Sequence, residues 1–298
     1  MKYFIYWAYG LKVASEIEFP EMYALGNDVS PDLTIRLCDV KLFDEQIDLY
    51  LPYSVRAAED KFFIHIKAVA HFVISSGNRI DVYPYQDAIP SDIRVYCLSN
   101  AFAAIFHQRK ILPLHAGAIT KDDKLSLIMG DTGAGKSTLL FHLMQKGWKV
   151  FSDDVVIATG AEGNQEILAT ASYPMMKLWK HQMKSMALGA EKQVRSGVDK
   201  FPYYFHNVFD TCQKTIEKII ILDTSSDATS YNIRKLKGVE SLLLLYKQIY
   251  RIEYLSNVDC RYHISTLSAI ANKIPCFEVR RPVFQACENE LVDLFISI

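Results

Sequence analysis

A glycine-rich octapeptide holds the residues of this chain that are best suited to chemistry. It reads Gly130-Asp131-Thr132-Gly133-Ala134-Gly135-Lys136-Ser137 and fits the pattern G-x-x-x-x-G-K-[ST] of a phosphate-binding P-loop. The glycines let backbone N–H groups approach phosphate oxygens, and a helix that begins here adds a favourable dipole. Lys136 is expected to reach the β- and γ-phosphates of a nucleotide, and the Ser137 hydroxyl to ligate Mg²⁺. The predicted nucleotide-binding residues are Gly130, Asp131, Thr132, Gly133, Ala134, Gly135, Lys136, Ser137 and Thr138.

The segments on either side of the octapeptide match this interpretation. An apolar run at 125–129 is typical of a buried strand. After the octapeptide, Leu139, Leu140, Leu143 and Met144 recur at helical spacing, and Gly147 is placed as a helix stop. The sequence therefore predicts strand, loop and helix in that order.

Two adjacent carboxylates, Asp153 and Asp154, follow the next predicted strand at 149–152. A strand–helix–strand crossover normally makes the two strands parallel, so their carboxyl ends meet at one sheet edge, where ligands bind. The pair is therefore expected beside the phosphates. One carboxylate can ligate Mg²⁺ and the other can accept a proton from an incoming hydroxyl. A solvated turn is the alternative interpretation.

His115 lies on the strand before the octapeptide. Apolar runs at 114–119 and 125–129 flank a polar turn at 121–124. If Asp122 and Asp123 are the centre of that turn, antiparallel pairing places His115 opposite Gly130. There it can contact a phosphate or orient the acidic pair. A slip of one residue would turn His115 to the other face, where it would be an ordinary core histidine.

The rest of the chain indicates an α/β fold with two regions. Residues 1–110 form a smaller β-rich α+β region, with strands expected at 3–7, 33–38, 62–66, 71–74 and 79–83 and a helix at 92–109 that Ser91 caps. Residues 111–298 form the P-loop domain with a mixed sheet. Its further predicted elements are a hairpin of 155–159 with 166–169, a helix at 175–188, a loop at 191–207, a strand at 216–223, and helices at 241–254 and 284–295.

Composition narrows the functional class. The chain has 298 residues, a formal net charge of −1 and no run of basic residues, so nucleic acid is not an expected partner. No apolar stretch reaches the length of a membrane span. The six cysteines form no C-x-x-C pair, which argues against structural zinc and fits a reducing cytoplasm.

Two further groups of residues could contact a substrate or a nucleotide. Lys200 with Tyr203 lies in the predicted loop, and Arg280 with Arg281 could hold a phosphate or a carboxylate bidentately. Ordinary surface charge is the alternative for both groups, and their roles stay open.

The order of these motifs resembles the HPr kinase/phosphorylase family. The resemblance covers about residues 112–160 closely: the His115 segment, the octapeptide with Thr138, Gly147, and Ser152-Asp153-Asp154. It implies an HPr-kinase-like C-terminal-domain fold that uses ATP and Mg²⁺. It also implies that Asp153 is the catalytic base for a Ser hydroxyl, that His115 assists it, and that Asp154 lies near the metal. Together with the P-loop pattern, the predicted catalytic residues are Asp153, His115 and Lys136, and the predicted metal ligands are Ser137 and Asp154.

One departure from that family bears on the reaction. The chain lacks a recognisable glycine- and arginine-rich signature loop, which puts phosphorolysis in doubt. The first hundred residues, opening Tyr9-Gly10-Leu11-Lys12-Val13, resemble the HPr-kinase-related proteins of peptide-maturation systems, among them lasso-peptide kinases.

The leading hypothesis is a cytoplasmic Mg·ATP-dependent kinase that acts on a Ser hydroxyl of a peptide or small protein, foremost the C-terminal Ser of a lasso precursor peptide. An HPr-like protein or a small molecule as acceptor, a nucleotide-binding regulatory module without catalysis, and a motor-type ATPase are the alternatives. Self-association into a homo-oligomer stays open.

Overall fold

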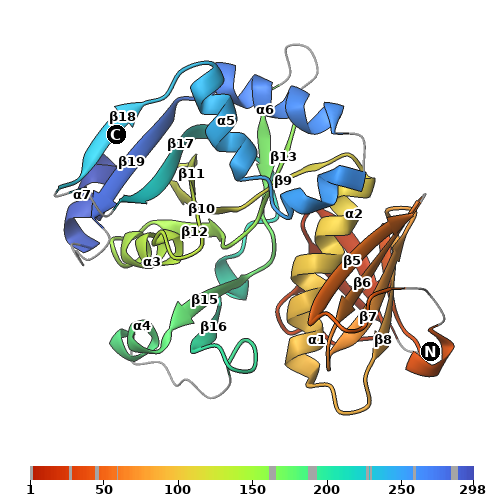
Figure 1. Ribbon diagram of the computed structural model, residues 1–298. Helices are drawn as coiled ribbons and strands as arrows, with labels where there is room; N and C mark the ends of the chain where they lie inside the picture. The colour runs from red at the N-terminus through yellow and green to blue at the C-terminus, as the bar shows by residue number, and fades with distance from the viewer. Residues whose placement is uncertain are drawn as a thin grey trace.

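Two large β-sheets and a small two-stranded one, with helices between and around them, make up the described part of the molecule (Figure 1). The computed structural model describes residues 3–26, 29–43, 47–58, 60–160, 166–186, 193–225, 228, 230–257, 260–282 and 288–298. Both large sheets contain parallel and antiparallel pairs, so the fold is mixed α/β.

The first sheet has eight strands in the order β3-β1-β2-β4-β8-β7-β6-β5. The strands are β1 (Phe4–Ala8), β2 (Leu11–Ser15), β3 (Tyr23–Ala24), β4 (Leu33–Leu37), β5 (Tyr53–Ala58), β6 (Lys61–Ile66), β7 (Ala70–Ser75) and β8 (Arg79–Pro84), with a short 3₁₀ turn η1 (Val40–Leu42). The five predicted strands are confirmed, and β2, β3 and β5 were not predicted.

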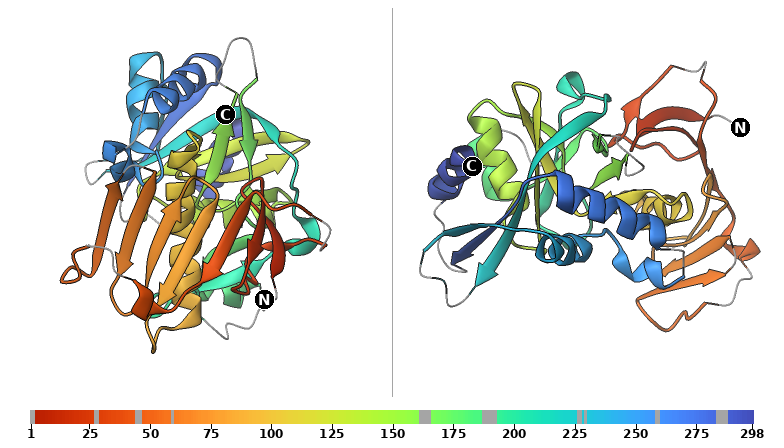
Figure 2. Two further views of the ribbon diagram at one scale, coloured as in Figure 1. Left: turned by 90° about the vertical axis from the view of Figure 1, so that its right-hand side faces the viewer. Right: turned by 90° about the horizontal axis from the view of Figure 1, so that it is seen from above.

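A helical layer covers one face of this sheet (Figure 2). It consists of α1 (Pro90–Tyr96), a π-helical turn η2 (Cys97–Ala101) and α2 (Phe102–Gln108), which run on without a break. The predicted helix at 92–109 is confirmed, but the predicted cap is wrong. Ile89 is the N-cap residue and Pro90 begins the helix, because a proline tolerates the first helical position, where an N–H has no partner.

The second sheet carries the P-loop. Its strands run in the order β12-β10-β11-β17-β14-β13-β9, and β19 pairs with β17 on one side and β18 on the other. They are β9 (Leu112–Leu114), β10 (Ala116–Lys121), β11 (Lys124–Gly130), β12 (Lys149–Ser152), β13 (Val156–Thr159), β14 (Leu168–Thr170), β17 (Lys214–Ser225), β18 (Asn232–Lys235) and β19 (Cys276–Pro282). The hairpin of β13 with β14 and the strand at 216–223 are confirmed, whereas β18 and β19 were not predicted.

Helices lie on both faces of the second sheet (Figure 1). On one face, α3 (Lys136–Gln145) and α7 (Glu288–Ser297) share an apolar cluster that includes Leu140 and Val292. On the other face, α5 (Val239–Lys247) and α6 (Arg261–Lys273) bury Leu245 and Leu267. The helix predicted at 241–254 is too long: α5 ends at Lys247, and a 3₁₀ segment η4 (Ile252–Asn257) follows. Of the helix predicted at 284–295, residues 284–287 lie outside the described residues.

A separate two-stranded hairpin corrects two predictions. β15 (Met175–Trp179) and β16 (Lys200–Tyr204) pair in register, where a helix at 175–188 and a loop at 191–207 were expected. Only Lys180–Ser185 is helical (α4), and a 3₁₀ turn η3 (His206–Val208) follows β16. Methionine and leucine favour a helix intrinsically, but pairing with β16 and burial of Met176 and Leu178 in the cluster beneath α3 make a strand of this segment.

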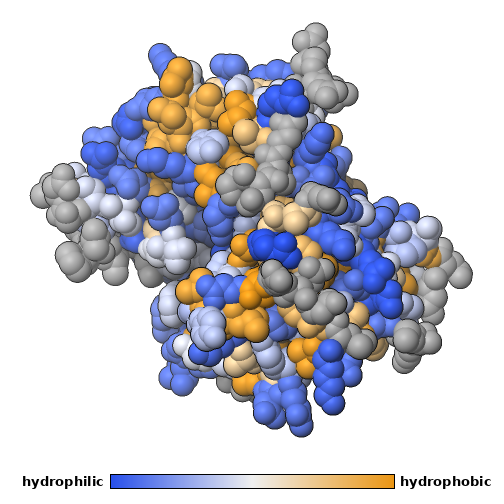
Figure 3. All heavy atoms as spheres, turned by 45° about the vertical axis from the view of Figure 1, so that its right-hand side comes forward, coloured by the Kyte–Doolittle hydropathy of each residue, from blue (hydrophilic) through white to orange (hydrophobic). Residues whose placement is uncertain are grey.

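The two regions are in direct contact. The core of the first sheet includes Val155, Tyr173 and Tyr254 from the second half of the chain, and the backbone N–H of Tyr9 donates to the Ser172 carbonyl over 2.7 Å. The boundary predicted at residue 110 stays a prediction. Within the described ranges, no helix has both the length and the apolar character needed to cross a membrane. Apolar side chains reach the surface in groups among hydrophilic ones (Figure 3).

Candidate phosphate-binding and acidic site

The β10–β11 hairpin has the predicted register. Ala116 pairs with Met129 and Lys121 with Lys124, which makes Asp122 and Asp123 the turn centre. Both turn residues have positive φ, 50° and 60°, as the tight hairpin turns that match strand twist require. His115 immediately precedes β10, so the pairing carries it to the end of β11 where the glycine loop begins.

The crossover also runs as predicted. β10 is antiparallel both to β11 and to β12, so β11 and β12 point the same way with β10 between them. The carboxyl end of β12 therefore meets the start of α3. There the Ser137 hydroxyl donates to Asp153 Oδ1 over 3.1 Å, which joins the glycine loop to the acidic pair.

The glycine loop needs glycine at its two ends. Gly130 has a φ of 137°, and a Cβ at this position would lie 2.4 Å from the Leu222 carbonyl oxygen. Gly135 has a φ of 102° and is the N-cap residue of α3, a backbone region that side chains rarely adopt. Between them, Asp131, Thr132, Gly133 and Ala134 form the turn, and Thr138 lies in the first turn of α3.

Lys136 is buried beneath the loop it belongs to. Its Nζ lies 2.9 Å from His115 Nε2 and donates to the carbonyls of Gly130 over 2.6 Å and Asp131 over 3.2 Å. These contacts use all three ammonium protons. Burial lowers the pKa of Lys136, against the opposing charges of Asp154 and Asp153. A phosphate would therefore replace at least one of these contacts.

His115 is held in one tautomer. Because Lys136 is a donor only, Nε2 of His115 must accept, which leaves the proton on Nδ1. Nδ1 then donates to the Asp154 carbonyl over 3.1 Å and lies 3.5 Å from its carboxylate. Burial, with the charge of Lys136, lowers the pKa of His115. His115 is thus a neutral connector between the lysine and the acidic pair.

The two carboxylates have opposite electrostatic environments. Burial and then the charge of Asp154 raise the pKa of Asp153. For Asp154, burial acts to raise the pKa, but the adjacent Lys177 ammonium, with the Lys136 ammonium, outweighs it and holds the pKa well below its ordinary value. Neighbouring groups whose pKa values are pushed apart are typical of acid–base sites. Asp154 also has a φ of 74°, a strained conformation for a residue other than glycine.

Lys177 on β15 is a site residue that the sequence did not indicate. Its Nζ donates to Asp154 Oδ2 over 2.6 Å, and its backbone N–H donates to Asp153 Oδ2 over 3.0 Å. Burial acts to lower its pKa, but Asp154 outweighs this effect and the pKa is raised. No motif contains this lysine, and the helix predicted at 175–188 gave it no reason to face the acidic pair.

Gln248 and Tyr250, which follow α5, were also missed. The side-chain Oε1 of the buried Gln248 accepts a hydrogen bond from the Gly130 N–H over 3.0 Å. The backbone carbonyl of Gln248 accepts another from the His115 backbone N–H over 2.7 Å. The Tyr250 ring stacks on His115 with centroids 5.7 Å apart. These residues fix His115 and the start of the loop from a segment more than a hundred residues away.

The remaining predicted residues have different neighbours: they are Lys200, Tyr203, Arg280 and Arg281. Lys200 pairs with Trp179 across the β15–β16 hairpin, its Nζ lies 4.9 Å from the Trp179 ring centroid, and its charge contributes to the lowered pKa of Lys136. Tyr203 pairs with Met176. Arg280 donates to Asp223 over 3.3 Å, whereas the Arg281 guanidinium lies beside Gly135.

The donor set fits a hard cation such as Mg²⁺. Ser137 and Asp153 supply a hydroxyl and a carboxylate oxygen 3.1 Å apart at the N-terminus of α3, and Mg²⁺ prefers oxygen ligands with few from the protein. The prediction had paired Ser137 with Asp154. That carboxylate contacts Lys177 and His115, and its assignment to the metal stays a prediction.

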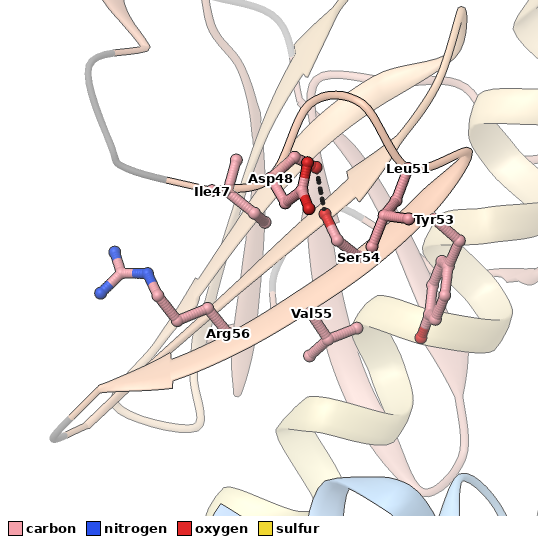
Figure 4. A pocket seen from close by; sticks show the side chains of 7 residues that line it. All are labelled: Ile47, Asp48, Leu51, Tyr53, Ser54, Val55 and Arg56. Atoms are coloured by element: carbon pink, nitrogen blue, oxygen red, sulfur yellow. Dashed lines mark hydrogen bonds between the residues drawn. The ribbon is translucent and has the colours of Figure 1, made fainter.

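A cavity of about 820 Å³ lies on the first sheet, away from this site (Figure 4). It opens between the segment 47–51 and β5, where the Ser54 hydroxyl donates to the Asp48 carbonyl over 2.7 Å. None of the predicted site residues lines it. The cavity therefore has no part in the chemistry considered below.

Comparisons with known proteins add little to this geometry. No protein-family model and no curated protein sequence matches the chain. Among solved structures, the Hpr(Ser) kinase/phosphatase from Coxiella burnetii matches with a TM-score of 0.32 and 12% identity, over 62% of this chain and 91% of that one. A TM-score this low supports no inference about function, so the family resemblance stays a prediction and the chemistry must be derived from this chain's residues.

Proposed function

We propose that this chain is a kinase that transfers the γ-phosphate of ATP to a Ser hydroxyl of a peptide or small protein. The observation that carries the proposal is a pair of adjacent carboxylates with oppositely shifted pKa values beside a P-loop lysine and serine. Nucleotide binding alone needs the loop, whereas phosphoryl transfer also needs a group that takes the acceptor proton.

The loop and α3 would hold the phosphates. The backbone N–H groups at the N-terminus of α3 attract anions, and Lys136 would leave His115 to contact the β- and γ-phosphates. His115 would then have a free lone pair on Nε2 while Nδ1 still contacts Asp154. Its stacking on Tyr250 keeps the ring in place during that exchange.

Asp153 would act as the base. As the acceptor oxygen attacks the γ-phosphorus, the bond from phosphorus to the bridging oxygen of ADP breaks, and the acceptor proton passes to the Asp153 carboxylate. Its raised pKa makes it the better proton acceptor of the two. Asp154 stays ionised through Lys177 and keeps His115 oriented.

Ser137 and one of the two aspartates would hold Mg²⁺. Asp153 is the carboxylate in contact with Ser137, and Asp154 is the one that the sequence resemblance assigns to the metal. When bound, the ion would neutralise the charge of the phosphate oxygens.

The acceptor is the finer part of the proposal. We infer a C-terminal Ser of a lasso precursor peptide from the resemblance of the first hundred residues alone, and a cytoplasmic location from the scattered cysteines. An HPr-like protein and a small molecule are the other acceptors to test.

The test is incubation of the purified full-length chain with γ-labelled ATP, Mg²⁺ and each candidate acceptor. Label on a Ser residue of a peptide is the expected result. Release of free phosphate only would make the protein an ATPase, and tight ATP binding without turnover would make it a nucleotide-dependent regulator. Either outcome would overturn the kinase proposal.

A further inference from the structure

The strand order brings a second cationic side chain to the P-loop. β19 is parallel to β17, and β17 is parallel to β11, so all three strands end at the same sheet edge. The register places Gly130 opposite Leu222, and Leu222 opposite Val279. Arg281 therefore lies two residues beyond the level at which the glycine loop begins.

Arg281 lies on the side of the sheet that α3 covers. Side chains two apart on a strand share a face, and Val279 packs in the same apolar cluster as Ala134 and Leu140. Arg280 points to the other face, where its Nε donates to Asp223. The sequence alone did not separate these two arginines, whereas the pleat assigns them opposite surroundings.

The Arg281 guanidinium lies against the loop itself. A Cβ built on Gly135 would be 3.4 Å from Nη2 and 3.6 Å from Cζ of Arg281. Gly135 is the N-cap residue of α3, so the guanidinium lies where phosphates are expected. The acidic pair follows β12, two strands from β11 on one side, and Arg281 is on β19, two strands away on the other.

Arg281 also has an unfilled donor. Its Nε is buried and has no hydrogen-bond partner among the described residues, and none of the ion pairs between those residues includes it. The residue as a whole is half-buried, but a buried N–H without an acceptor is costly, which makes an anionic ligand the natural complement. The planar fork of a guanidinium matches phosphate oxygens bidentately.

We propose that Arg281 binds a phosphate group of the nucleotide at the P-loop, from the side opposite Asp153 and Asp154. The inference rests on the proposed function insofar as it takes the loop to be a nucleotide site. It adds a phosphate-binding residue that no P-loop motif contains, held on β19 almost 150 residues after the loop. The ligand class is a nucleoside di- or triphosphate.

The test compares Arg281→Gln with Arg280→Gln in the full chain, by calorimetric titration with ATP, ADP and AMP in the presence of Mg²⁺. Arg281→Gln is expected to weaken ATP binding about 10-fold to 100-fold, the value of one charge-assisted contact. Arg280→Gln should stay within about two-fold. Arg281→Lys, which keeps the charge and loses the fork, should fall between the two.

Thermal unfolding without nucleotide separates binding from a structural role. Removal of a half-buried guanidinium whose buried Nε has no partner should leave the melting temperature unchanged or raise it, whereas loss of a structural contact would lower it. Equal ATP affinity in Arg281→Gln and the parent chain would overturn the proposal. If the parent chain binds no ATP, both the Arg281 proposal and the proposed function fail. If ATP binding depends on Arg281 but no Ser is labelled, the Arg281 assignment stands and the kinase assignment fails.

Discussion

The Nζ of Lys136 lies 2.9 Å from Nε2 of His115, and this contact determines the protonation of the histidine. An ammonium only donates, so His115 must be neutral, with its proton on Nδ1 toward Asp154. Lys136 and the acidic pair are thereby connected through one imidazole ring. Binding of phosphate would draw Lys136 away and leave His115 as the link to the carboxylates.

Replacing Lys136 by Met should abolish ATP binding and transfer, with a loss of at least about 100-fold in affinity, because the β/γ-phosphate contact disappears. Titration with ATP measures this loss. Lys146→Ala is the matched control: Lys146 ends the same helix and pairs with Asp293 at the surface. ATP affinity equal to that of the parent chain in Lys136→Met would remove the P-loop assignment.

Asp153→Asn should fold and bind ATP but transfer phosphate about 10²-fold to 10⁴-fold more slowly, the usual contribution of a general base. Asp154→Asn should instead lose stability, because Lys177 keeps its buried charge without a partner. Single-turnover assays and chemical unfolding distinguish the two effects. Transfer at the full rate in Asp153→Asn would show that Asp153 is not the base.

Lys177→Met should lower the free energy of unfolding by about 1–3 kcal/mol, because Asp154 loses its direct cationic hydrogen-bond partner. Both side chains are less than a third exposed, 19% and 28%, so solvent screens the pair only in part. Chemical unfolding of the double variant with Asp154→Leu should cost less than the sum of the single variants. Lys180→Met, at an exposed position, is the control. If the change in unfolding free energy of the double variant equals the sum of the two single changes, Lys177 and Asp154 are not coupled.

The free energy of unfolding should fall as pH decreases from about 6.5 towards 4. Burial, with the charge of His263, lowers the pKa of His107 to about 4. In the unfolded chain His107 binds a proton near pH 6.5, whereas in the folded chain it binds one only near pH 4. The contribution of neutral His107 to stability is therefore present above pH 6.5 and is lost as the pH falls towards 4. His107→Gln should reduce the loss between pH 7 and pH 5 in urea unfolding, whereas the exposed His181→Gln should not. If His107→Gln loses as much unfolding free energy between pH 7 and pH 5 as the parent chain, His107 is not the source of the pH dependence.

Local patterns predicted those parts of the site that lie close together in the sequence. A four-residue turn set the register that brings His115 to Gly130, and one helix between parallel strands brought Asp153 to Ser137. Lys177 and Gln248 could not be found in this way. Their partners lie more than 20 and more than 100 residues away, and long-range strand pairing decides which residues meet.

The strands of the first sheet that were not predicted were missed for a different reason. β2 and β5 are strands because β1 and β6 pair with them, although their own sequences show weak alternation. The helix predicted over β15 was wrong because the methionines of this segment favour a helix, whereas pairing with β16 makes it a strand. In both cases tertiary contacts overrode intrinsic preference.

The sharing of core residues between the two regions has a consequence during synthesis on the ribosome. The first hundred residues emerge first, yet their apolar cluster is completed by Val155, Tyr173 and Tyr254. Until those residues are translated, part of an eight-stranded sheet presents uncovered apolar surface, the condition under which nascent chains aggregate or recruit chaperones. Ser152, which immediately precedes the acidic pair, contacts the Ser172 hydroxyl, and the Ser172 carbonyl accepts from the Tyr9 N–H, so one short series of contacts joins the acidic pair to the early-synthesised sheet.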